Sequence, residues 1–457
     1  MVLLIGTYDL GRQPFGLASP AAWLRRAGVN ATAVDLSRQP LPIEAAASAR
    51  FVAFYLPMHT ATRLALPVID RVRALNPSAT ICAFGLYAPL NEALLRQHGV
   101  TAILGAEAEE DLVTVVRSGG TLVPPDTVAP PDTGRTDVRP LRALPKLQFI
   151  QPDRSGLPSL DKYASLTMPD GTIKVVGATE ATRGCKHRCR HCPIVPIYDG
   201  QFRVVPVDVV LADVHAQVEQ GATHITFGDP DFFNGPTHAR RIVEAFHRQY
   251  PDVTYDVTIK IEHLLDHRAL LPVLAESGCL FVTSAVESVD DMVLAKLEKG
   301  HTRADFIAAV SLCRQAGLTL SPTFVPFSPW TTIASYRQLL DAIEELDLIE
   351  HVAPVQWSIR LLVTWGSRLL ELSEIRAVIR PFDPKTLTYP WAHGDARVDE
   401  LQRQVMALVG VKALRSRTEM FNAVRNLAEP PDPRVSIPIS AAIARAAIPY
   451  MNEPWYC

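Results

Sequence analysis

Three cysteines lie close together in the stretch TRGCKHRCRHCPIVP, residues 182–196, and are Cys185, Cys189 and Cys192. Their spacing, C-x3-C-x2-C, lets three thiolates meet at one metal centre and leaves a coordination position open. An iron–sulfur cluster with one open iron fits this pattern. A zinc ion would need a remote fourth ligand, because a histidine adjacent to Cys192 has poor geometry. Basic side chains in the same loop would offset the charge of a thiolate-bound cluster.

The other cysteines are dispersed. Cys82, Cys279 and Cys313 each stand alone in apolar surroundings, where a buried packing role is expected. The seventh, Cys457, is the last residue of the sequence. An odd number of cysteines in a long chain argues against a disulfide framework and favours metal or redox use of a subset.

Strand and helix patterns alternate around the cysteine loop from about residue 170 to 370. Six apolar runs of strand length are expected to be strands, at 173–180, 224–229, 254–262, 280–288, 318–327 and 355–363. Six strand–helix repeats predict a partial (βα)6 barrel that resembles a TIM barrel, with its site at the carboxyl ends of the strands. The cysteine loop directly follows the first of these strands.

A second alternation occupies the first 115 residues or so. Five apolar runs, 2–6, 30–36, 51–57, 80–87 and 100–105, predict a flavodoxin-like, doubly wound parallel sheet. The clearest helix is SPAAWLRRAG, 19–28, in which Ser19 is expected to cap the helix and Gly28 to end it. The predicted domains are this α/β domain (1–117), a proline-rich linker (118–150), the barrel (151–379) and a mainly helical extension (380–457).

The length, hydrophobic content and net charge of the chain limit which kinds of binding partner are expected. The chain has 457 residues, is 48% hydrophobic and has a formal net charge of −3 with interspersed signs. Neither nucleic acid nor a membrane is expected as a partner. No apolar run approaches the roughly 20 residues that span a bilayer. The N-terminus lacks the basic region of a signal peptide, so a cytoplasmic location is the default expectation.

The cysteine loop resembles the signature of radical S-adenosylmethionine (SAM) enzymes, C-x3-C-x-Φ-C, in which Φ is usually aromatic; here Φ is His191, which could stack on adenine. The resemblance implies a 4Fe-4S cluster, SAM bound at its open iron, and reductive cleavage to a 5′-deoxyadenosyl radical that abstracts hydrogen from a substrate. It also implies a reducing partner such as flavodoxin or ferredoxin. The substrate is not indicated.

Further SAM contacts follow from the same resemblance. FGDPDFF resembles the segment that meets the SAM amino group, which implicates Gly228, Asp229 and Asp231. SAVESVDDMVLAKLEKGHT resembles the stretch that contacts the ribose and carboxylate, through Glu287 and Ser288. Lys260 is expected to pair with the SAM carboxylate, although a surface lysine is nearly as consistent with the sequence.

The N-terminal domain resembles the cobalamin-binding domain that precedes many radical SAM barrels. The implied cobalamin contacts are Pro14, Gly16, Leu17, Gly85, Tyr87, Gly105 and Glu107. The Asp-x-His-x-x-Gly motif that supplies a lower histidine ligand is missing from the sequence. Methyl transfer to an unreactive carbon or phosphorus centre is the commonest outcome for this architecture, and rearrangement, ring formation and chemistry on a metalloid stay open. The alternatives are a radical SAM enzyme without cobalamin, whose first domain only shapes the pocket, and a non-catalytic iron–sulfur protein.

The ending EPWYC, together with the cysteine loop and FGLYAPLN, resembles radical SAM proteins with a CUAEP or CCAEP tail. In these proteins a cysteine precedes selenocysteine or a second cysteine. The resemblance implies that Cys457 stands just before a selenocysteine codon read as a stop. The alternative is that Cys457 is an incidental terminal thiol.

Overall fold

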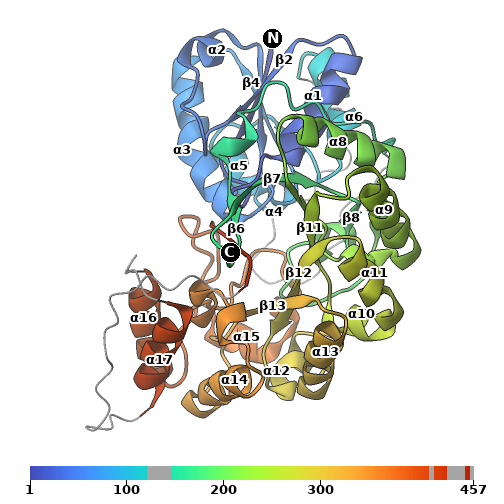
Figure 1. The fold of residues 1–457 in the computed structure, drawn as a ribbon. Helices are drawn as coiled ribbons and strands as arrows, with labels where there is room; N and C mark the ends of the chain where they lie inside the picture. The colour runs from blue at the N-terminus through green and yellow to red at the C-terminus, as the bar shows by residue number, and fades with distance from the viewer. Residues whose placement is uncertain (121–146, 411–415, 430–447, 453–457) are drawn as a thin grey trace.

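The computed structural model describes residues 1–120, 147–410, 416–429 and 448–452. Figure 1 shows an N-terminal α/β unit at the top, a curled sheet with its helices below it, and two C-terminal helices at the side. This is the predicted fold class. Most of the expected linker and the terminal Cys457 lie outside the described residues.

The N-terminal sheet has five strands, all parallel, in the order β2-β1-β3-β4-β5. Their bounds are β1 Val2–Gly6, β2 Ala31–Asp35, β3 Phe51–Tyr55, β4 Thr80–Phe84 and β5 Ala102–Ile103. The strands are almost continuously buried because helices cover both faces. The predicted flavodoxin-like sheet is confirmed.

Within residues 1–120, six helices surround this sheet: α1 Phe15–Arg26, α2 Ile43–Ser48, α3 His59–Leu75, α4 Tyr87–Leu90, α5 Glu92–Gln97 and α6 Glu109–Arg117. Apolar residues of α1 and α6 form one core with the sheet. Residues of α2, α3 and α5 form a second core on the opposite face. The helices cover the two faces of the sheet, and the loops at the carboxyl ends of its strands face the half-barrel.

The predicted start of the first helix is wrong. Helix α1 begins at Phe15, so Ser19 and Pro20 lie inside it. Ser19 does not cap the helix; its hydroxyl donates to Glu109 Oε1 at 2.7 Å. The sequence favours a cap at Ser19 locally, but a contact with α6 determines its role. Gly28 does end the helix region, with a φ of +75°.

The second sheet is curled and has the order β13-β12-β11-β10-β7-β6-β14. Strands β7 Ile173–Thr179, β10 His224–Phe227, β11 Thr254–Thr258, β12 Cys279–Glu287 and β13 Thr319–Phe324 run parallel. Strands β6 Ser165–Thr167 and β14 Tyr450–Met451 extend the sheet antiparallel. The result is a half-barrel.

The sixth predicted barrel strand does not form. Within 355–363, residues up to Trp357 belong to a 3-10 helix, Pro354–Trp357, and only a single bridge joins Phe327 to Arg360. Trp357 is 1% exposed, and its ring packs 5.4 Å from that of Phe421. The apolar run therefore packs against a C-terminal helix instead of joining the sheet.

Helices follow the strands of the half-barrel and continue into the C-terminal part. They are α7 Val195–Tyr198, α8 Val207–Glu219, α9 Pro236–Gln249, α10 Ile261–Asp266, α11 Leu271–Glu276, α12 Asp291–Lys296, α13 Arg303–Gln315, α14 Ile333–Glu345, α15 Ser373–Val378, α16 Ala396–Gly410 and α17 Arg417–Ala428. The three lone cysteines Cys82, Cys279 and Cys313 are buried in the cores of the two domains, as expected. None of the helices within the described ranges is both long and apolar enough to cross a membrane.

Buried polar contacts fix the N-terminal domain against the half-barrel. Arg154, 4% exposed, makes two hydrogen bonds to Asp213 of α8, at 2.7 and 2.8 Å, and a third to Gln13 Oε1 at 2.9 Å. An apolar cluster joins Leu90 of α4 to Ile197 and Tyr198 of α7. The carboxyl edge of the first sheet therefore faces the loop that carries the three cysteines.

Candidate functional site

The cysteine loop is closed by a small antiparallel hairpin of β8 Thr182–Gly184 and β9 Phe202–Val204. Gly184, directly before Cys185, has a φ of +78°. A Cβ atom there would lie 2.4 Å from Tyr198 Cδ1 and 2.6 Å from the Gln201 carbonyl oxygen. Only glycine fits, so this residue determines how the chain enters the loop.

The three thiols lie near one another and are largely shielded from water. Cys185 is 9% and Cys189 is 6% exposed. Burial raises the pKa of Cys185 to about 11 and that of Cys192 to about 12, and the neighbouring Cys189 adds to both shifts. Three such sulfurs become thiolates when a metal centre binds them. The donor set therefore fits a 4Fe-4S cluster with one open iron.

Asp229 holds the hairpin. It follows β10, is 2% exposed, and accepts hydrogen bonds from the Thr182 hydroxyl at 2.6 Å and the Ala181 N–H at 3.0 Å. Burial raises its pKa to about 7. Both carboxylate oxygens thus bind the segment that leads into the cysteine loop, which gives Asp229 a positioning role.

Glu287 lies at the end of β12 with a φ of +68° and is 7% exposed. Its Oε1 is 3.1 Å from His191 Nε2 and 3.3 Å from Lys299 Nζ. Burial alone would raise the pKa of Glu287, but Lys299 and His191 outweigh it and lower the pKa to about 2. The left-handed backbone turns this carboxylate toward the cysteine loop, where it stays ionised.

Two buried lysines lie near the cysteine loop, Lys260 after strand β11 and Lys299 after helix α12. Lys260, 8% exposed, precedes α10, and its Nζ is 3.3 Å from Glu262 Oε2. Lys299 is 3% exposed. Burial would lower the pKa of Lys299, but Glu287 and Cys189 outweigh it and raise the pKa. Lys260 is therefore a buried side chain and not the surface lysine that the sequence left open.

The structure adds Lys299 and His301 to the predicted site residues. His301 is 6% exposed, and burial together with Lys299 and Lys260 lowers its pKa to about 4. Both lie in the loop after α12, inside the segment that carries the resemblance around Glu287. No local pattern in the sequence indicates them, because Lys299 enters the site through its contact with Glu287, which lies 12 residues earlier in the chain.

Gly228 and Ser288 have local backbone roles. The Gly228 N–H donates to the Thr179 carbonyl at 2.7 Å, and a Cβ at Gly228 would lie 3.3 Å from Arg12 Nη1. The Ser288 hydroxyl accepts from the Asp290 N–H at 3.1 Å. The strand end after β10 therefore lies close to the N-terminal domain.

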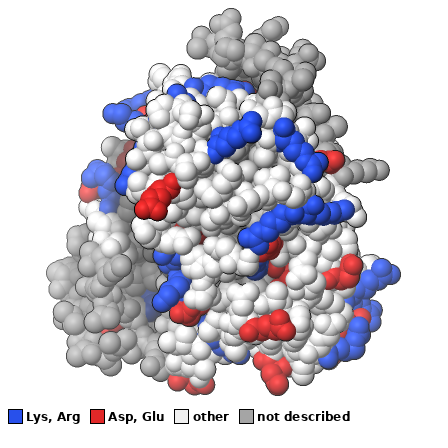
Figure 2. Space-filling view, turned by 90° about the horizontal axis from the view of Figure 1, so that it is seen from above, with Lys and Arg blue, Asp and Glu red and all other residues white. Residues whose placement is uncertain are grey.

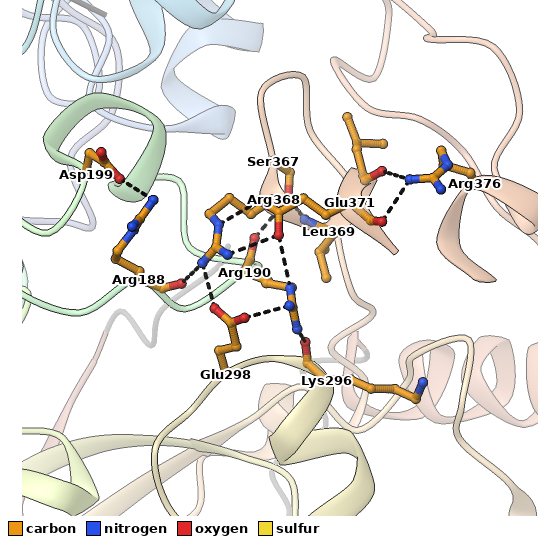
Figure 3. A network of polar contacts seen from close by, with 11 residues as sticks. Arg188, Arg190, Asp199, Lys296, Glu298, Ser367, Arg368, Leu369, Glu371 and Arg376 are labelled. Carbon is orange, nitrogen blue, oxygen red and sulfur yellow. Dashed lines mark hydrogen bonds and ion pairs between the residues drawn. The ribbon is translucent and has the colours of Figure 1, made fainter. Parts of the chain in front are cut away.

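Two arginines of the cysteine loop, Arg188 and Arg190, form ion pairs with acidic side chains of neighbouring segments (Figure 3). Arg188 Nη2 is 2.8 Å from Asp199 Oδ1. Arg190 Nη2 is 2.6 Å from Glu298 Oε1, and Arg368 reaches the other oxygen of Glu298 at 2.7 Å. These arginines therefore hold the loop through Asp199 and Glu298, whereas Lys260 and Lys299 lie beside the cysteines.

The first three residues predicted to contact cobalamin are used in packing. Pro14 precedes the first turn of α1, and Leu17 is fully buried in the core. A Cβ at Gly16 would lie 2.0 Å from Tyr55 Cζ. These residues bring α1 close to the sheet, and their contact with cobalamin stays a prediction.

In the loops after β4 and β5, one buried carboxylate, that of Glu107, lies near the half-barrel. Gly85 has a φ of +105° in a turn, and Tyr87, the first residue of α4, packs in the same core as α3. A Cβ added at Gly105 would meet no atom of the described residues within 4 Å. Glu107, 3% exposed, has no hydrogen bond to either carboxylate oxygen among the described residues, and its Oε2 is 3.7 Å from Arg203 Nε of β9. Glu107 and Gly105 fit a polar ligand between the domains.

Residues 179–343 match the family described as the radical SAM superfamily. The tRNA-2-methylthio-N(6)-dimethylallyladenosine synthase of Pseudomonas paraeruginosa is 26% identical over 202 residues, which cover 41% of this chain and 44% of that enzyme. The same enzyme of Fusobacterium nucleatum is 26% identical over 186 residues, 36% of this chain and 40% of that enzyme. The chain thus spans less than half the length of these curated relatives.

Solved structures are similar over more of the chain. The cobalamin-dependent SAM radical enzyme OxsB, with aqua-cobalamin and SAM bound, has a TM-score of 0.70 at 14% identity and covers 93% of this chain and 71% of its own. The radical SAM methyltransferase TsrM of Kitasatospora setae, with cobalamin and a [4Fe-4S] cluster bound, has a TM-score of 0.56 at 18% identity, with 76% and 70% covered. The strands of the half-barrel and the cysteine loop thus lie largely within a segment that is similar to the radical SAM superfamily, and most of the chain shares its fold with these two solved structures.

Proposed function

We propose that this chain binds a 4Fe-4S cluster through Cys185, Cys189 and Cys192 and cleaves SAM reductively to modify a substrate. The observation that carries the proposal is the three-thiol loop at the carboxyl ends of the half-barrel strands, beside two buried lysines. A cluster held there supplies single electrons to bound SAM. The residues of this chain bind and orient SAM and exclude water.

The buried charges suit the groups of SAM. Lys260 and Lys299, 8% and 3% exposed, offer ammonium groups for its carboxylate. Glu287 stays ionised and offers a hydrogen-bond acceptor for ribose hydroxyls. His191 Nδ1 is buried without a hydrogen-bond partner among the described residues, which leaves it available to a polar ligand.

We further propose that cobalamin binds between the N-terminal sheet and the half-barrel, and that methyl transfer is the reaction. Support comes from the strand order, from the fold shared with OxsB and TsrM, and from Glu107 at the interface. Bound cobalamin would supply a transferable methyl group. Within the N-terminal domain, the loop after β5 would contribute Gly105 and Glu107 to this site. A radical SAM enzyme without cobalamin is the alternative.

The proposed partners are an unidentified substrate and a reducing protein such as flavodoxin or ferredoxin. Nucleic acid is not proposed, even though the curated relatives are tRNA enzymes. On the face shown in Figure 2, Lys and Arg are interspersed with Asp and Glu instead of forming one basic patch. Recognition of a phosphate backbone favours clustered positive charge.

The test is anaerobic reconstitution of the full chain with iron and sulfide, followed by reductant and SAM. We expect 5′-deoxyadenosine from the wild type and none from Cys189→Ala. Cys313→Ala is the matched control, because Cys313 is a buried cysteine of α13 in the hydrophobic core. A wild type that carries a cluster yet leaves SAM intact would indicate a non-catalytic iron–sulfur protein.

The cobalamin proposal is tested in parallel with and without hydroxocobalamin. We expect cobalamin to co-purify with the chain through gel filtration and S-adenosylhomocysteine to form together with 5′-deoxyadenosine. 5′-Deoxyadenosine alone, with no retained cobalamin, would favour the enzyme without cobalamin.

A further inference from the structure

A second group of metal-binding side chains lies beside the cysteine loop. It consists of His187, Asp231 and His263, which come from the loop itself, from the turn after β10 and from α10. One ligand atom of each lies within 4.8 Å of the other two. This arrangement joins two imidazoles and one carboxylate from segments far apart in the sequence.

Asp231 and His263 are buried and His187 is half-buried, and two polar atoms of the trio have no hydrogen-bond partner among the described residues. Asp231 is 0% and His263 is 1% exposed. Asp231 Oδ2 is 2.7 Å from His263 Nδ1, yet neither atom has a hydrogen-bond partner among the described residues, so the contact lacks the direction of a hydrogen bond. His187 Nε2 lies 3.6 Å from Asp231 Oδ2 and shares a hydrogen bond of 3.1 Å with His263 Nε2. A cation among these atoms would satisfy all three groups.

Neighbouring groups hold the ligands in place. The Asp231 Oδ1 atom accepts a hydrogen bond from the Phe233 N–H at 3.1 Å. His187 Nδ1 is 3.5 Å from Glu262 Oε2, which also pairs with Lys260. Metal-binding histidines and carboxylates usually have their second polar atom held in this way.

We propose that His187, Asp231 and His263 bind one divalent transition-metal ion, zinc or ferrous iron, separate from the iron–sulfur cluster. Both ions accept two imidazoles and a carboxylate, and three protein ligands leave a position for water or substrate. Asp231 then serves the metal and not the SAM amino group. The proposal holds whether or not the chain cleaves SAM.

The test is zinc and cobalt binding to the full chain with its cluster already loaded, so that the cysteines are occupied. We expect one zinc per chain, and a cobalt spectrum of nitrogen and oxygen ligands without a thiolate-to-cobalt charge-transfer band. Asp231→Asn and His263→Ala should abolish binding. Glu262→Gln should weaken it by roughly 10-fold, as for other groups that orient a ligand.

The control is His215→Ala, because the His215 side chain on α8 is 58% exposed. It should bind zinc like the wild type. Unchanged zinc affinity in both ligand variants, a thiolate–cobalt band, or no binding to the wild type would overturn the proposal. If the ligand variants do not fold, as judged by circular dichroism, the wild-type cobalt spectrum alone decides between the outcomes.

Discussion

At the scale of single residues, the site is a set of buried charges that need one another. Lys299 and Glu287 lie 3.3 Å apart at 3% and 7% exposure. Removing one member of such a pair leaves an uncompensated charge in a region of low polarity, whereas removing both is far less costly. Each charge of the pair is therefore tolerated in the buried site only while its partner is present.

Lys299→Met should destabilise the chain by about 3 kcal/mol or more, because Glu287 then keeps only His191 as a partner. Glu287→Gln in the same chain should recover much of that loss. Urea denaturation of the two single variants and the double variant measures the coupling. Lys296→Met is the control, since its ion pair with Glu374 is solvent-exposed and should contribute little to stability. Additive effects at Lys299 and Glu287 would contradict the pairing.

The stability of the chain should depend on pH through Glu107, whose pKa is raised by burial, whereas the pKa of Glu287 is lowered by its partners. Burial raises its pKa from 4.5 to about 7, so the folded chain keeps a proton that the unfolded chain releases. As pH rises from about 4.5 to 7, this group therefore lowers the stability, by up to about 3 kcal/mol. Glu107→Gln should melt higher than the wild type at pH 8 and nearly level with it at pH 5.

Melting temperatures at pH 5 and pH 8 measure this difference. Glu276→Gln serves as the control, because Glu276 is exposed on α11 and should show no such divergence. A Glu107→Gln variant that stays parallel to the wild type at both pH values would show that the carboxylate is already ionised in the folded chain.

At the scale of elements, the close packing of helices on the sheets determines which residues can occupy their contact positions. Helix α1 packs so near the sheet that a Cβ at Gly16 would lie 2.0 Å from Tyr55 Cζ. Gly16→Ala should therefore destabilise the N-terminal domain by about 1–3 kcal/mol, as overpacked cores do. Gly105→Ala is matched to it, since a Cβ there would meet no described atom within 4 Å. Thermal unfolding should separate the two variants; equal melting temperatures would mean that the helix shifts freely.

The elements show why the sequence predicted some parts well and others poorly. Strand–helix alternation and three closely spaced cysteines are local patterns, so the two sheets and the cysteine loop were predictable. The apolar run 355–363 has strand character, but Trp357 finds Phe421 in a distant helix. Ser19 likewise bonds to Glu109, 90 residues away. Such choices depend on tertiary contacts, which local propensity does not encode.

Some site residues were predicted from the sequence, and others became apparent only in the folded structure. Glu287 ends β12 and Lys260 follows β11, and both were predicted from the resemblance to radical SAM enzymes. Lys299 and His301 lie in the loop after a helix and become site residues only because that loop folds back over β12. The trio of His187, Asp231 and His263 joins three separate segments, so no spacing pattern in the sequence could reveal it.

At the scale of the whole molecule, the two domains meet at the segment that carries the cluster ligands. Arg183, two residues before Cys185, donates to Glu109 Oε1 of α6 at 2.7 Å and to Glu180 Oε2 at 2.8 Å. Its guanidinium also lies 5.2 Å from the ring of Phe15 in α1. The N-terminal domain therefore helps to hold the cysteine loop.

Glu109→Ala tests this coupling. Glu109 is 3% exposed, and its removal leaves Arg183 buried with a single acidic partner. We expect hydrogen exchange to accelerate in α6 and also in β8 and the cysteine loop, because local opening then costs less free energy. Glu110→Ala changes the exposed neighbour and should leave both regions as in the wild type. Acceleration confined to α6 would mean that the half-barrel alone positions the three cysteines, and that the N-terminal domain contributes only its own surface to the reaction.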